Sequence, residues 1–99
     1  IAGDKTCDVE ELKNELKITG KYSRLGANEV KRITGYTIGG VAPVGLSVEI
    51  PKVTDISLFR FEQVWCAAGH QFFVFPTSPE DLVSLTGSLV SSKIGISID

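Results

Sequence analysis

A glycine-rich segment, Gly35-Tyr36-Thr37-Ile38-Gly39-Gly40-Val41-Ala42-Pro43-Val44-Gly45-Leu46, carries the residue types best suited to chemistry. Four glycines and one proline alternate there with apolar side chains, whereas solvated linkers are richer in polar residues. Gly39 and Gly40 allow positive φ or close backbone approach, and Pro43 fixes φ and lacks an N–H. The pattern predicts a loop that presents backbone groups at a defined place, or else a tight turn that only joins two elements.

His70 is the only histidine, and Gly69 before it allows a sharp turn. It is interpreted either as a pocket residue that binds substrate or transfers a proton, or as an exposed turn histidine. We expect no metal site, because only Cys7 and Cys66 could join His70 as typical zinc ligands. Cys7 precedes a helix start, where a thiol pKa can fall, or it is a half-buried structural residue. Cys66 lies in an apolar strand and is expected in the core.

Helices and strands alternate irregularly along the chain, which predicts the α+β class. Helices are expected over residues 9–17, capped by Asp8 and ended at Gly20, over 28–34, and over 79–86 behind Ser78. Strands are expected over 22–25, 48–53, 63–67 and 71–75, and extended chain over 89–96, with a turn or short helix at 56–61. Trp65, Phe72, Phe73 and Phe75 are expected to supply core and pocket wall, or in part an oligomer surface.

Length and charge narrow the class of protein. Ninety-nine residues with 42% apolar and 22% charged side chains make one globular domain. No apolar run is long enough to span a membrane, no signal peptide is visible, and two cysteines suggest a cytoplasmic location. The net charge of −2 argues against a protein that coats a nucleic-acid backbone. Residues 1–60 carry nine basic and eight acidic side chains, so contact with a short nucleic-acid end stays open.

Three segments together resemble the YbaK/ProRS-associated family of aminoacyl-tRNA editing domains. They are Gly3-Asp4-Lys5 before the first helix, Thr34 to Leu46 with the GxxxP pattern at Gly39–Pro43, and Ala68-Gly69-His70-Gln71 followed by the SPEDL and LTG motifs of residues 78–87. The resemblance implies a curved mixed β-sheet, a partial barrel, flanked by helices. It also implies that residues 1–99 are the C-terminal two-thirds of a deacylase domain, without the family's N-terminal part and its lysine.

The activity that the resemblance implies is hydrolysis of the ester of a mischarged tRNA, Cys-tRNA or Ala-tRNA, with tRNA-Pro as the expected carrier. Gly39, Pro43 and His70 are then the expected catalytic residues. The expected substrate-binding residues are Tyr36, Ile38, Gly40, Val41, Ala42 and Gly69, with no cofactor and no metal. Tyr36 either stacks on the terminal adenine or packs under the loop.

The expected partners are the tRNA acceptor end, prolyl-tRNA synthetase and a second copy of the chain, and no membrane. Lys31 and Arg32 either meet phosphates or are solvated helix charges. Two alternatives to the enzyme stay open. One is a non-catalytic domain that binds a tRNA end or a synthetase; the other is a generic interaction domain. The enzyme reading predicts that the Gly39–Pro43 loop and the Gly69-His70 turn face one shared pocket.

Overall fold

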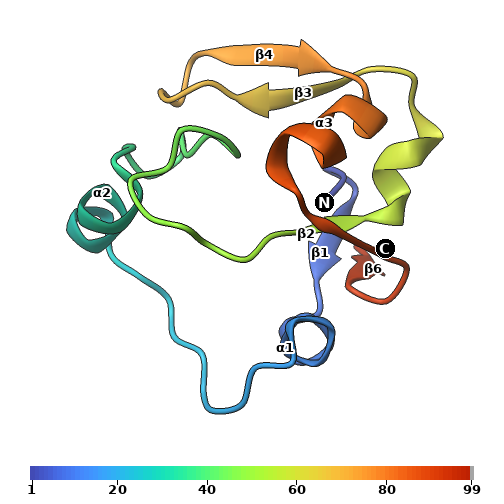
Figure 1. Ribbon diagram of the computed structural model, residues 1–99, viewed down its shortest axis with the longest axis horizontal. Coiled ribbons are helices and arrows are strands. Elements are labelled where there is room, and N and C mark those ends of the chain that lie inside the picture. Colours follow the sequence, from blue (N-terminus) through green and yellow to red (C-terminus); the bar gives the residue numbers. More distant parts are fainter. Residues whose placement is uncertain (99) are drawn as a thin grey trace.

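The computed structural model describes residues 1–98 (Figure 1). The elements in chain order are β1 (Lys5–Cys7), α1 (Val9–Leu16), α2 (Ala27–Thr34), β2 (Val53–Asp55), the 3-10 helix η1 (Ile56–Arg60), β3 (Val64–Ala67), β4 (Val74–Thr77), α3 (Pro79–Thr86), β5 (Leu89–Ser91) and β6 (Gly95–Ser97). The mixture of helices and strands confirms the predicted α+β class. None of the helices in residues 1–98 has the length and apolar character that a membrane crossing requires.

The strands pair in both senses, but within residues 1–98 they form separate sheets, so the single curved mixed sheet that was expected is not present. β1 pairs with β6 and β3 with β4 in antiparallel fashion, while β2 and β5 run parallel. Within residues 1–98 these are three two-stranded ladders, and they do not join into a closed barrel. The strands are three or four residues long. Residues 46–52 belong to none of them, and only the carbonyl of Lys52 extends the β2–β5 pairing, by accepting a hydrogen bond from the N–H of Leu89 at 3.1 Å. In place of one curved sheet, the structure therefore has three short two-stranded sheets.

The helix starts follow the predicted caps. Asp8 Oδ1 accepts a hydrogen bond from the N–H of Glu11 at 3.2 Å, and Ser78 Oγ accepts one from the N–H of Asp81 at 3.1 Å. These side chains satisfy amides that the first helical turn leaves without partners. At their ends, α2 and α3 stop at glycines with positive φ, Gly35 and Gly87. Local sequence signals therefore account for the starts of α1 and α3 and for the ends of α2 and α3.

Two expectations between α1 and α2 were wrong. Helix α1 ends before Gly20, because Lys17 itself adopts the left-handed conformation and its N–H bonds to the carbonyls of Asn14 and Lys13. The strand predicted at residues 22–25 does not form, and these residues are exposed. No strand among residues 1–98 pairs with this segment, and an extended segment without a partner has no ladder to stabilise it.

The later strands are displaced from their predicted positions. Of residues 48–53 only Val53 enters a strand, and the second hairpin strand begins at Val74 because residues 68–73 form the turn. Residues 89–96 divide into β5 and β6, which pair with different partners. The predicted short helix at 56–61 is confirmed as η1, whose first turn is capped by the buried carboxylate of Asp55.

The core is small and draws on distant parts of the chain. Its buried apolar side chains are Ala2, Ala42, Val64, Leu82 and Ile94. In Figure 1, α3 lies beneath the β3–β4 hairpin, and the segment after α2 crosses the molecule to reach β2. Because Ala42 is only 5% exposed, the glycine-rich segment is anchored in the core and does not stand free in solvent.

Candidate functional site

The glycine-rich segment folds into a closed loop after α2. The N–H of Ser47 donates to the carbonyl of Thr34 at 3.1 Å, which fastens the two ends of the loop together. Within it, residues 37–40 form a turn in which the N–H of Gly40 donates to the carbonyl of Thr37 at 2.9 Å. Gly39, the third residue of this turn, has a φ of +84°, a value that favours glycine. The loop geometry thus depends on local hydrogen bonds and on one glycine conformation.

Tyr36 supports this loop from inside. Its hydroxyl donates to the carbonyl of Val44 at 2.7 Å, and its N–H donates to Thr34 Oγ1 at 3.1 Å. The ring also lies beside Gly69, where a β-carbon would be 3.4 Å from Tyr36 Cε1. Tyr36 is half-buried and connects the loop to the turn that holds His70.

The loop and the His70 turn are in direct contact. A β-carbon at Gly40 would lie 2.6 Å from both Cα and C of His70, closer than such atoms approach in real structures. Gly39 lies next to Gln71, with 3.5 Å from its β-carbon position to Gln71 Cβ. The absence of a side chain at Gly40 therefore lets two backbone segments about thirty residues apart in sequence pack together.

A cavity of about 590 Å³ opens beside the loop. Of the nine predicted site residues, Val41, Ala42 and Pro43 line it, and the other six do not. Most of its walls are apolar, with contributions from β3 and α3 such as Cys66 and Leu82. The predicted shared pocket is therefore present only in part: the two turns touch, but His70 lies outside the cavity and is exposed.

The cavity also contains polar groups that the sequence did not single out. Thr54 Oγ1 and Ser88 Oγ are 2.6 Å apart and share a hydrogen bond. Lys52 lines the same cavity, and its Nζ donates to the carbonyl of Ile50 at 3.0 Å. Thr54 and Ser88 meet because β2 and β5 pair in parallel, a contact between segments that no local sequence signal predicts. Together with Thr34 and Thr86, these groups add polar atoms to a mostly apolar cavity.

His70 is held by its own turn. Its Nδ1 accepts a hydrogen bond from the N–H of Phe72 at 3.2 Å, so the ring proton of the neutral imidazole lies on Nε2. Its ring contacts Phe72 and Phe73, whose side chains are exposed and do not line the cavity, so these two rings are neither core nor pocket wall, and a role in an oligomer surface stays a prediction. The turn takes up residues 68–73, which moves these two rings out of the strand that would have buried one of them.

Neither cysteine is activated. Burial is the largest influence on both thiols and raises the pKa of Cys7 and of Cys66 above its ordinary value. The carboxylates of Asp8 and Asp55 raise the pKa of Cys7 further, so the start of α1 does not produce a reactive thiolate. Within residues 1–98, no three side chains of the His, Cys, Asp or Glu type lie close enough to hold a metal ion.

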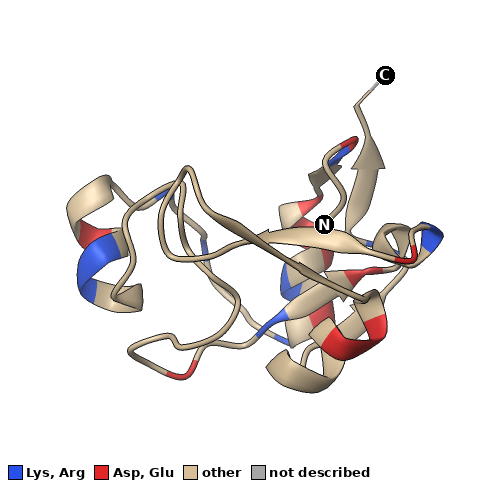
Figure 2. Cartoon of the chain, turned by 90° about the horizontal axis from the view of Figure 1, so that it is seen from above, with Lys and Arg blue, Asp and Glu red and all other residues tan. Residues whose placement is uncertain are grey.

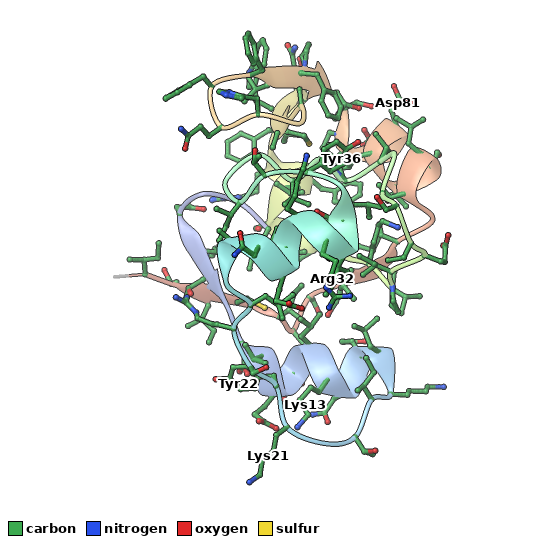
Figure 3. The ribbon with its side chains drawn as sticks, turned by 90° about the vertical axis from the view of Figure 1, so that its left-hand side faces the viewer. Lys13, Lys21, Tyr22, Arg32, Tyr36 and Asp81 are labelled. Atoms are coloured by element: carbon green, nitrogen blue, oxygen red, sulfur yellow. The ribbon has the colours of Figure 1, made fainter. Side chains whose placement is uncertain are left out.

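The basic residues of α2 are already engaged. Arg32 pairs with Glu29 on the exposed face of the helix, and Lys31 Nζ donates to the carbonyl of Gly35 at 3.0 Å. Figure 3 views the molecule with α2 in front and Arg32 pointing away from Tyr36 and the loop. Arg32 is therefore directed away from the loop that carries the candidate site.

The order of these features along the chain matches a known domain. A profile of the aminoacyl-tRNA editing domain matches residues 1–85, which include the loop, the His70 turn and most of α3. The chain belongs to the aminoacyl-tRNA editing domain family. This confirms the resemblance that the three sequence motifs indicated.

Individual relatives support the same assignment for this editing domain. The uncharacterized protein YwhH of Bacillus subtilis (strain 168) is 34% identical over 89 residues, which are 90% of this chain and 55% of YwhH. A proline–tRNA ligase of Caldicellulosiruptor saccharolyticus is 35% identical over 60 residues, 61% of this chain and 10% of the ligase. This chain therefore spans about half the length of YwhH.

A solved structure shows the same fold. A crystal structure described as that of a candidate trans-editing enzyme for prolyl tRNA synthetase superposes with a TM-score of 0.87 at 29% identity. The alignment covers 97% of this chain and 59% of the other. The arrangement of helices and short ladders in the editing domain is therefore an arrangement seen in a solved relative.

Proposed function

We propose that this editing domain hydrolyses the ester of a mischarged tRNA that is not held by the synthetase that charged it. The observation that carries the proposal is the loop of residues 39–43, which is anchored by buried Ala42, packed against the His70 backbone and open to a cavity. Family membership supports the reaction class, and the relatives named for proline–tRNA ligase and prolyl tRNA synthetase support tRNA-Pro as carrier.

The reaction needs an attacking water and donors for the oxyanion that develops on the ester carbonyl. In our proposal the donors are backbone amides of the loop. Pro43 has no N–H and that of Gly40 is bonded to Thr37, so Val41 and Ala42, which line the cavity, offer the remaining amides on that side. Water adds to the carbonyl carbon, the bond to the ribose oxygen breaks, and that oxygen leaves with a proton.

His70 has a different position in this proposal. It lies outside the cavity with Nε2 as its remaining donor, so it binds the nucleotide side of the substrate and does not contact the amino-acid side chain. The amino-acid side chain enters the cavity beside Val41–Pro43. We propose a small side chain, cysteine or alanine, and no cofactor. The proposed partners are the tRNA acceptor end, prolyl-tRNA synthetase and a second copy, in the cytoplasm.

One observation favours a second candidate function. Because the exposed His70 is separated from the cavity, the ionisable side chains on the cavity walls within residues 1–98 are Lys52 and Cys66, and burial raises the pKa of the Cys66 thiol. A cavity with so few groups that can transfer a proton is what a non-catalytic domain that binds a tRNA end or a synthetase would have.

A deacylation assay distinguishes the two. The full-length protein is incubated with tRNA-Pro charged with alanine, with cysteine and with proline, and release of the amino acid is followed. Editing predicts release of alanine or cysteine and sparing of proline. Binding of all three without release above the uncatalysed rate would support the non-catalytic candidate.

A further inference from the structure

The turn between β3 and β4 presents a cluster of exposed rings, which we call the aromatic tip: His70, Phe72 and Phe73. Phe72 is 78% exposed and Phe73 is 63% exposed. The centre of the His70 ring lies 5.3 Å from that of Phe72 and 5.4 Å from that of Phe73. Exposed apolar rings gathered in one place are typical of a binding surface.

The aromatic tip is ordered by the backbone beneath it. The N–H of Phe73 donates to the carbonyl of His70 at 3.0 Å, and the N–H of Ala68 donates to the carbonyl of Phe73 at 3.0 Å. The third bond, from the N–H of Phe72 to His70 Nδ1, fixes the imidazole relative to the turn. A turn whose backbone is ordered before binding loses little conformational freedom when a ligand stacks on the rings that it carries.

The hairpin that carries the tip has no charge. From Gln63 to Pro79 the sequence contains no Asp, Glu, Lys or Arg, and the hairpin is drawn entirely in tan in Figure 2. Binding of phosphates by charge neutralisation therefore has no basis here. Stacking of a nucleic-acid base on an aromatic face needs no charge and tolerates any base.

The tip is also continuous with the candidate site. Gly40 lies against the backbone of His70, so a nucleotide on the tip is next to the loop of residues 39–43. We propose that the aromatic tip stacks the unpaired bases at the 3′ end of tRNA and thereby places the terminal ester over this loop. This inference rests on the proposed function. His70 Nε2 is the donor that remains for a base edge or a ribose oxygen.

The test compares Phe72→Ala, Phe73→Ala and Phe72→Leu in the full-length protein. Leucine keeps the apolar surface but removes the aromatic face. Tyr22→Ala is the matched control, because Tyr22 is 61% exposed and lies beside α1, at the opposite end of the molecule from the hairpin (Figure 3). The measurements are KM and kcat for deacylation, and affinity for a short single-stranded RNA that ends in CCA.

We expect each tip variant to raise KM and to weaken RNA binding by roughly 5- to 150-fold, the loss of one base–aromatic stack. Phe72→Leu should behave like Phe72→Ala, and Tyr22→Ala like the wild type. The ratio of wild-type to variant affinity should stay constant as salt is raised, because no charge is removed. The melting temperature should stay unchanged, because both rings are exposed.

The outcomes separate this inference from the proposed function. Wild-type deacylation with unchanged KM and RNA affinity in both alanine variants would overturn the inference and leave the function standing. RNA binding lost in the variants, without deacylation by the wild type, would support the inference and overturn the enzyme. A third outcome is that the wild type sediments as a dimer and the variants as monomers, while RNA affinity is unchanged. In that case the tip is a contact between copies and the inference is wrong.

Discussion

The α-carbon of Gly40 approaches the backbone of His70 so closely that a methyl group at position 40 would lie 2.6 Å from His70 Cα. This contact joins the loop of residues 39–43 to the aromatic tip. Neither segment is held in this position by a strand ladder between them. Their relative placement therefore depends on this close approach, on the neighbouring contact of Gly39 with Gln71 and on the Tyr36 side chain.

Gly40→Ala should separate the loop from the His70 turn. Forcing an extra methyl group into a packed contact costs about 1–3 kcal/mol, and displacing the loop should also lower kcat/KM. Urea unfolding and the deacylation assay measure the two effects. Gly3→Ala is the control, because the β-carbon position of Gly3 has no neighbour within 4 Å. Equal stability of Gly40→Ala and Gly3→Ala would show that the contact is looser than described.

Pro43→Ala should affect editing more than folding. Releasing φ at this position should cost only about 0.4–1 kcal/mol of stability, whereas a loop misplaced by about 1 Å can lower kcat by roughly 100-fold. The exposed Pro51 lies outside the loop, so Pro51→Ala should leave kcat unchanged. A large drop in melting temperature with unchanged activity per folded molecule would show that Pro43 is only structural.

Tyr36→Phe removes the hydrogen bond from the tyrosine hydroxyl to the carbonyl of Val44. We expect a loss of about 0.5–1.5 kcal/mol in the free energy of unfolding, with the fold retained. Tyr22→Phe is matched to it, because the Tyr22 side chain is exposed. The same urea midpoint for both variants would contradict a role for the Tyr36 hydroxyl in closing the loop.

The two thiols should react slowly with iodoacetamide in the folded protein. Their raised pKa values leave less thiolate at neutral pH than in the unfolded chain, and the rate should increase as pH rises. The same shifts make the fold less stable as pH rises through the folded pKa values. Mass spectrometry of labelled Cys7 and Cys66, with and without urea, measures the rates. Faster labelling of Cys7 in the folded state would indicate an activated thiol.

Self-association remains a prediction from the sequence. The β3–β4 hairpin exposes Val74 and Trp65, the latter at the edge of the cavity, and exposed apolar faces and strand edges recruit partners. Sedimentation over a range of concentrations should show a dimer or larger species, which Trp65→Ser weakens. A wild type that stays monomeric at every concentration would exclude this surface as a contact between copies.

The helices could be predicted from the sequence because their signals are local. Ser78 caps a helix whose first residue is Pro79, and Gly87 follows its end, all within one short segment. The strands were less predictable, because pairing partners are far apart. Residues 22–25 have strand-like composition but meet no partner within the described residues, while Pro76 lies inside β4 at a position where its missing N–H is tolerated.

The candidate site also has features that local sequence predicts and features that depend on distant contacts. The turn at Gly39 agrees with its residue type, and the two glycine turns led to the prediction of one shared pocket, whereas the structure brings the loop and His70 into direct contact. The sequence did not predict that His70 lies outside the cavity, because this depends on the side of the loop against which β3 and α3 pack. Thr54 and Ser88 were missed because isolated hydroxyl residues carry no pattern until the parallel pair places them together.

The contact between Thr54 and Ser88 also has a consequence for folding. These residues are 34 positions apart, and closing a long loop costs chain entropy that a short hairpin does not pay. The β3–β4 hairpin and α3 lie within that loop and shorten it once they form. We expect rapid formation of the hairpin and slower parallel pairing of β2 with β5. Competence to bind in the cavity should therefore return only after the hairpin has formed.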